Sequence, residues 1–159
     1  MDNSSDGTLT RKLNCCYCEH LTPRYNDIVI DTEGRDSMGS RSALVAARIA
    51  IIPIRPDQMD PASEAKLIVR VDTARLFNPG LRVLFVIACA KDDPSTQEFA
   101  DVRSLVAQVT TATLAKTVIH EQTALRNAFA DGLSISEYQP ADTRAVTEMT
   151  NLYLEVFNN

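Results

Sequence analysis

Short apolar runs alternate with longer mixed stretches along this chain. Four runs are rich in aliphatic and β-branched residues, as buried strands are, and they cover residues 27–31, 49–54, 81–89 and 117–119. Between and after them, apolar residues recur at helical spacing, which predicts helices over residues 37–48, 61–77, 95–108, 121–130 and 140–157. Alternating strands and helices predict βαβ units with parallel strands. The pattern therefore predicts an α/β fold, a three-layer parallel sheet with helices on both faces.

Capping residues and polar stretches mark the borders of these elements. Asp60 is expected to cap the helix that starts at Pro61. A further short helix is predicted over residues 11–21. Residues 1–10 are polar and are expected to be disordered, which leaves a single domain over residues 11–159.

Composition narrows the class of protein. Of the 159 residues, 45% are hydrophobic and 23% are charged, which is ordinary for a soluble globular domain. No apolar run approaches the roughly 20 residues of a membrane span. The N-terminus has no signal-peptide hydrophobic region, so we expect a cytoplasmic protein without membrane contact. The net charge of −5 disfavours a protein coated in nucleic acid, while scattered arginines keep nonspecific DNA binding open.

One stretch organises the rest of the sequence. Residues 25–32, YNDIVIDT, run through an apolar segment to Asp31, and Gly34, Arg35 and Asp36 follow. This stretch resembles the Walker B strand and the switch segment of the ParA/MinD family of deviant P-loop ATPases, in its plasmid-partition branch. The similarity rests on the order of the motifs from about residue 20 to the end. The family's N-terminal strand and lysine-containing phosphate loop have no counterpart in this sequence, so the resemblance implies an incomplete P-loop NTPase-like fold.

The resemblance implies roles for individual residues. Asp31, at the end of its strand, would hold magnesium directly or through water. Arg35 and Asp36 would form the ancestral catalytic switch segment together with Asp31. Gly34 would face the nucleotide, and Arg126 would face nucleotide or DNA, so ATP and magnesium are the implied cofactors. From the residues alone, Asp31 equally fits a turn cap, and Arg35 and Asp36 fit solvated surface charges.

Three departures from the family pattern predict that ATP binding is weak or lost. Glu33 stands where the partition branch tends to have a small residue, so it brings negative charge close to the expected γ-phosphate. Ala88 stands where the family commonly has an asparagine for the adenine edge, and alanine offers no polar side-chain atom. Gly34 and Gly39 are spaced as in a P-loop, but no lysine follows Gly39. A switch-type loop is therefore favoured over a phosphate cradle.

Cysteine and histidine residues raise the question of metal binding. Residues 15–20, CCYCEH, hold three cysteines beside a histidine, but the remaining cysteine, Cys89, is remote in sequence. A helix that packs through small apolar thiols is favoured over a zinc site. His120 follows the last predicted strand, and a hydrogen-bonded strand-end histidine is favoured there over a general base.

We expect a ParA-like plasmid or chromosome partition protein that is truncated or degenerate and acts through protein partners, because phosphoryl transfer needs the lysine-bearing loop. Two alternatives stay open. One is an active partition ATPase with an atypical phosphate site, and the other is a regulatory or fertility-inhibition module of a mobile element. The family's first strand is central in its sheet, so its loss would uncover strand edges. We therefore expect a homodimer, an altered strand order, or docking to a partition-complex protein.

Overall fold

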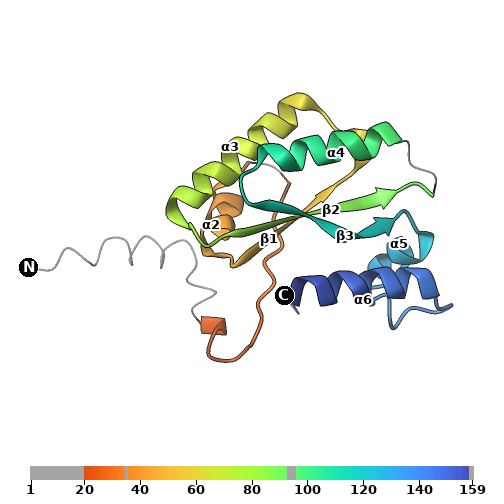
Figure 1. Ribbon diagram of the computed structural model, residues 1–159. Coiled ribbons are helices and arrows are strands. Elements are labelled where there is room, and N and C mark those ends of the chain that lie inside the picture. Colours follow the sequence, from red (N-terminus) through yellow and green to blue (C-terminus); the bar gives the residue numbers. More distant parts are fainter. Residues whose placement is uncertain (1–19, 35, 93–95, 158–159) are drawn as a thin grey trace, which may run out of the picture. The chain divides into compact units, whose positions relative to one another are not determined.

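The computed structural model describes residues 20–34, 36–92 and 96–157. Its elements follow one another in the order α2 (Met38–Ala46), β1 (Ile49–Ile54), a 3-10 helix η1 (Pro56–Gln58), α3 (Pro61–Phe77), β2 (Arg82–Ala90), α4 (Thr96–Gln108), β3 (Ala112–His120), α5 (Thr123–Ala130) and α6 (Thr143–Phe157) (Figure 1). The three strands form one parallel sheet in the order β1-β2-β3. The predicted α/β class with a parallel sheet is confirmed. None of the described helices combines the length and apolar character needed to cross a membrane.

The chain divides into two compact units that each draw on two stretches of sequence. The first unit comprises Met1–Ala50 and Val69–Arg82, and the second comprises Ile51–Ile68 and Val83–Asn159. The division passes through β1 and α3, so each of these elements contributes to both units. Most of the sheet belongs to the second unit, together with α4, α5 and α6.

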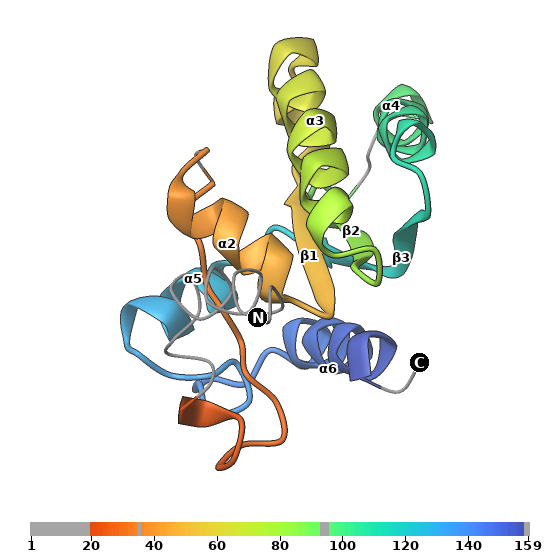
Figure 2. The ribbon, with the colours of Figure 1, turned by 90° about the vertical axis from the view of Figure 1, so that its left-hand side faces the viewer.

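The core of the second unit is built around β2. Residues 83–87 are all buried, and Phe85 is completely inaccessible to solvent. A strand covered on both faces requires such an unbroken buried run, which explains why the sequence shows no polar alternation there. Helices α4 and α6 lie on opposite sides of β3, and α4 contributes the buried Val102 and Leu105 (Figure 1, Figure 2). The second unit is therefore layered, with helices on both sides of a parallel sheet.

Local chemistry fixes the ends of several helices. The backbone N–H of Ser63 donates to Asp60 Oδ2 at 2.9 Å, so the predicted cap of α3 is confirmed. In the first unit, the Asn78 side-chain amide donates to the carbonyl oxygens of Leu44 at 3.1 Å and Ala47 at 2.7 Å. These two bonds satisfy carbonyl groups at the C-terminal end of α2, which would otherwise lack partners.

The strand predicted over residues 27–31 is wrong. This segment of the first unit is extended but pairs with no strand among the described residues, and Val29 is 86% exposed. A β-branched run favours an extended backbone locally, but a strand also needs a neighbour that takes up its backbone hydrogen bonds. Among the described residues the sheet accordingly has three strands, where four were predicted. The last strand is longer than predicted, because β3 spans nine residues where the sequence indicated three.

Two irregularities interrupt the pairing of β2 with β3. Phe85 pairs with Leu114 but Ile87 pairs with Val118, so β3 carries extra residues at this point. Further along, Cys89 is the extra residue on β2, and its φ of 52° lies in the left-handed region that non-glycine residues seldom adopt. Such bulges release backbone groups from the ladder and turn side chains in new directions. Both irregularities lie where α6 meets the sheet or where strands end.

Candidate functional site

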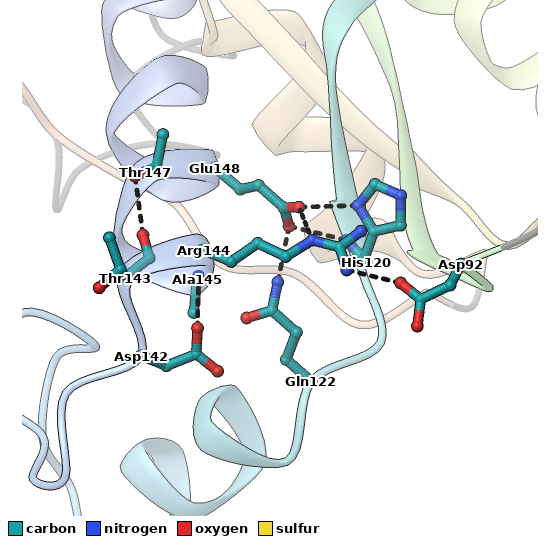
Figure 3. A network of polar contacts seen from close by, with 9 residues as sticks. All are labelled: Asp92, His120, Gln122, Asp142, Thr143, Arg144, Ala145, Thr147 and Glu148. Carbon is teal, nitrogen blue, oxygen red and sulfur yellow. Dashed lines mark hydrogen bonds and ion pairs between the residues drawn. The ribbon is translucent and has the colours of Figure 1, made fainter.

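Polar side chains gather beyond the carboxyl ends of β2 and β3, where ligands bind in open parallel sheets. We call Asp92, His120, Gln122, Arg144 and Glu148 the carboxyl-edge network (Figure 3). The His120 Nδ1 atom lies 2.7 Å from Glu148 Oε1, and Arg144 Nε donates to the same oxygen at 3.0 Å. The other end of the Arg144 guanidinium donates to Asp92 Oδ1 at 2.5 Å. One chain of contacts thus joins the two strand ends to the first turns of α6.

Glu148 is the centre of the network. Its second oxygen, Oε2, accepts from the backbone N–H of His120 and from the side-chain amide of Gln122, both at 2.9 Å. Burial of this carboxyl, which is 13% exposed, raises its pKa, but the hydrogen bonds from His120 and Arg144 together outweigh that effect and hold the pKa of Glu148 below its usual value. Glu148 therefore carries its negative charge at neutral pH.

A second glutamate of α6, Glu155, binds β3 closer to the start of that strand. Glu155 accepts from the backbone N–H groups of Lys116 at 2.8 Å and Thr117 at 3.1 Å, and from the Thr117 hydroxyl at 3.0 Å. The β3 irregularity releases these consecutive N–H groups from the ladder. Burial raises the pKa of Glu155, yet the donated backbone hydrogen bonds lower it further, so the net pKa lies below the usual value.

The spacing of the two glutamates matches the spacing of their partners. Seven residues of helix, from Glu148 to Glu155, cover about 10.5 Å. Three residues of strand, from Thr117 to His120, cover about 10 Å. The match requires α6 to run antiparallel to β3, with both carboxylates along the strand. The glutamates therefore take N–H groups that an added strand would otherwise use, which protects the outer strand of the described sheet.

The carboxyl-edge network has the parts of an acid–base site, but its one arginine is already bound by two carboxylates. A histidine whose Nδ1 faces a carboxylate is the arrangement that orients a general base. Here the same carboxylate also binds Arg144, which is held in turn by Asp92, and the network contains no nucleophilic side chain. The hydrogen bond to Glu148 agrees with the prediction that His120 is a satisfied strand-end histidine. The network joins β2, β3 and α6 within the second unit, and its two carboxylates outnumber its one guanidinium.

Two hollows adjoin this region. A space of about 10 Å³, room for a single water, lies where β2 ends and is lined by Pro56, Asp57, Cys89, Ala90, Lys91 and Glu98. A wide, open depression of about 530 Å³ lies at the first turns of α5 and α6 and is lined by Thr123, Ala124, Asn127, Tyr138, Pro140, Ala141, Asp142, Thr143 and Arg144. The first is far smaller than the few hundred Å³ that a nucleotide-sized ligand occupies. The arginine of the second is bound to two carboxylates.

The structure gives Asp36 arginine partners that were not predicted. Arg41 binds both carboxylate oxygens, with Nε at 2.8 Å and Nη2 at 2.6 Å, and Arg70 Nε lies 3.5 Å away. The hydrogen bond from Arg41 is the main cause that holds the pKa of Asp36 below its usual value; desolvation opposes it, and the charges of Arg41 and Arg70 add to the lowering. Asp36 is thus engaged within the first unit, at the start of α2.

The other predicted site residues are divided between the two units. Asp31 and Gly34 lie in the exposed extended segment of the first unit, and Arg35 lies outside the described residues. Arg126 lies on α5 in the second unit, exposed and 3.8 Å from Glu121. Asp31 therefore does not close a buried strand, and its role as a magnesium ligand stays a prediction. Within the described ranges, no group of three His, Cys, Asp or Glu side chains is placed to hold a metal ion.

The glycine pair that resembles a P-loop leads into a helix that caps itself. Ser37 precedes α2, and its hydroxyl accepts from the backbone N–H of Ser40 at 3.1 Å while the Ser40 hydroxyl accepts from the N–H of Ser37 at 3.1 Å. These donors are then no longer available to a phosphate.

The three cysteines at residues 15–18 lie outside the described part of the chain.

The sequence reading missed Glu148 and Glu155. The signal was present, because two acids stand seven residues apart in a helix whose inward positions also include the buried Ala145 and Val156. Acids on an apolar face indicate that the helix covers unpaired backbone donors. Comparison with protein-family models gives no match for this chain, and comparison with curated proteins gives none either.

Proposed function

We propose that this chain is a partition protein of the ParA/MinD kind that does not hydrolyse ATP and acts through protein partners. The order of sequence motifs supports the kinship, and a parallel α/β sheet with polar residues beyond its strand ends is compatible with it. One observation carries the second half of the proposal. The arginines near the carboxyl ends of the strands are held by carboxylates of the same chain.

These ion pairs can be followed strand by strand. Arg55, after β1, lies 3.4 Å from Asp57 through both Nε and Nη2. Arg144 lies between Asp92 and Glu148 at the ends of β2 and β3. Phosphoryl transfer is almost wholly positioning and neutralisation of phosphate charge, so it needs cations that are free to turn to the phosphates. A triphosphate at this edge would have to displace carboxylates that belong to the fold.

Negative charge adds to the same effect. In the carboxyl-edge network, the two carboxylates of Asp92 and Glu148 outnumber the single guanidinium of Arg144. This excess of negative charge would repel a triphosphate at the same edge. A chain that lacks the groups needed for phosphoryl transfer can still bind other proteins through its surface. We infer that its partner is a second copy or a protein of the partition complex.

A calorimetric titration with ATP and magnesium tests the loss of nucleotide binding. An intact ParA-type ATPase serves as the positive control under the same buffer and temperature. We expect no saturation below about 1 mM, which corresponds to less than about 4 kcal/mol of binding free energy. Micromolar affinity would contradict the proposal and favour the atypical phosphate site.

A plasmid-loss assay tests the partition role separately. The chain is expressed in a host that carries a low-copy plasmid with a ParA-type partition system, and the fraction of plasmid-free cells is counted over generations. Competition for the partition complex should raise the loss rate, while a high-copy plasmid without a partition system should be unaffected. Equal loss rates with and without the chain, at matched expression, would contradict a role in that complex.

A further inference from the structure

Arg75, in the last turn of α3, has a buried charged group that lacks a partner. Its Nε, Nη1 and Nη2 atoms are all buried, and none of them makes a hydrogen bond in the part of the chain that the structure describes. Arg75 as a whole is partly exposed, so its exposed surface lies on other atoms. Arginine side chains usually bury the aliphatic stem and keep the guanidinium in water. Arg75 reverses this arrangement, because the guanidinium is the buried part.

The position of Arg75 on α3 explains why the guanidinium is buried. Val71 and Ala74 are both buried, and the Asn78 side chain reaches the end of α2 within the first unit. Residues three and four apart on a helix lie on one face. Arg75 comes four residues after Val71 and three before Asn78, so it belongs to this inner face of α3. The helix therefore directs a charged side chain to the side where it also buries apolar ones.

Two acids of the first unit do not supply the missing partner. Asp72 stands three residues before Arg75, a spacing that allows ion pairs on a helix, but Asp72 is exposed and accepts no hydrogen bond from Arg75. Asp36 is held by Arg41 through both oxygens and lies 3.5 Å from Arg70 Nε. A guanidinium cannot release its proton, and a buried charge is costly unless it is paired. The described residues thus contain a permanent buried charge without its counter-ion.

We propose that the Arg75 guanidinium binds a small oxyanion, a carboxylate or a phosphate group, at the inner face of α3. The planar fork of N–H donors fits two oxygens of either group, and such charge-assisted pairs are the strong ones. Arg75 precedes the start of β2, whereas the carboxyl-edge network lies beyond the ends of β2 and β3. The proposal therefore concerns a site other than the nucleotide edge, goes beyond the partition function and does not depend on it.

Thermal melting of the full chain tests this site, with inorganic phosphate as one probe and acetate as the other. Each is compared with chloride at the same ionic strength and pH. For a dissociation constant of about 10 mM, about 50 mM of the anion favours the folded state about sixfold and raises the melting temperature by about 2–4 °C. The increase should saturate with concentration. A response to phosphate, to acetate or to both supports the site and shows which group it accepts.

A variant without the guanidinium separates binding from the general effect of salts. Phosphate also stabilises folded proteins because it is excluded from their surface, and this part should remain in every variant. Arg75→Gln keeps a similar stem but no charge, so it should lose the saturable part of the increase. Arg48→Gln is the matched control, since Arg48 is an exposed arginine of the same unit, and it should respond as the unchanged chain does.

Far-UV circular dichroism shows whether each variant is folded before the melts are compared. If Arg75→Gln does not fold, Arg75→Lys takes its place, because it keeps the charge but loses the fork; its saturable increase should shrink markedly. The proposal is overturned if the unchanged chain shows no saturable increase with either anion. It is also overturned if the folded Arg75 variant responds as the unchanged chain does, or if Arg48→Gln loses the response equally.

Discussion

The replacement of Glu155 by alanine tests whether the α6 glutamates stabilise the sheet edge. Glu155 accepts three hydrogen bonds from β3, two of them from the consecutive N–H groups of Lys116 and Thr117. A hydrogen bond to a charged group contributes about 1.5–3 kcal/mol, and an unsatisfied buried donor costs about 1–3 kcal/mol. Glu155 is only partly buried, so water would replace part of what is lost. We therefore expect Glu155→Ala to lower the free energy of unfolding by about 2 kcal/mol.

Urea denaturation followed by far-UV circular dichroism measures this change. The midpoint should fall while the slope stays the same, because the surface exposed on unfolding is nearly unchanged. For a chain of this size, the same loss corresponds to a melting temperature lower by about 4–8 °C. Glu33→Ala removes the same charge from an exposed position in the extended segment and should leave the midpoint where it was. If Glu155→Ala behaves like Glu33→Ala, the carboxylate is not a fixed partner of the strand and the reasoning fails.

Three further changes follow from the same contacts. The pKa values of Glu148 and Glu155 in the folded chain are lowered from 4.5. The stabilisation by these carboxylates is therefore complete above the pKa of the unfolded chain, and it is lost as the pH falls through the lower pKa values of the folded chain. Urea midpoints measured from pH 6 to pH 2.5 should drop, and they should drop less in Glu155→Ala. Glu148→Gln should cost about 1–3 kcal/mol, measured by the same denaturation, because His120 and its neighbours lose a charged acceptor, and an unchanged midpoint would contradict the geometry. Asp60→Ala removes the cap of α3 and should lower the midpoint slightly, whereas Asp60→Ser should largely preserve it.

Local chemistry made much of the fold predictable. The helix that begins at Pro61 was expected from the proline and from the aspartate before it, and the structure shows the capping hydrogen bond. Strand β2 was expected from the apolar run that follows Arg82, and residues 83–87 of that run are all buried. The cap of α3 joins residues that are close in sequence. For β2, burial on both faces requires apolar side chains along the whole run.

Long-range pairing made the rest unpredictable. Residues 27–31 have the composition of a strand, but whether they form one depends on a neighbour elsewhere in the chain. β3 was underestimated because Thr113 and Lys116 interrupt the apolar pattern before the predicted residues 117–119. Lys116 and Thr117 lie where the strand bulges and where Glu155 binds it, thirty-nine and thirty-eight residues later in the chain. No periodicity within either segment reveals such a contact, although the two acids of α6 were a usable hint.

The edges of the sheet decide whether a strand of another chain could be added to it. The lost family strand led us to expect open edges, and an open edge invites a strand from another chain. In the described sheet, β3 has N–H groups occupied by Glu148 and Glu155. At the other side, β1 contains Pro53, which has no N–H to offer and belongs on edge strands for that reason. Addition of a strand is thus disfavoured at both sides of the described sheet, so another protein would have to bind this unit through side-chain surfaces.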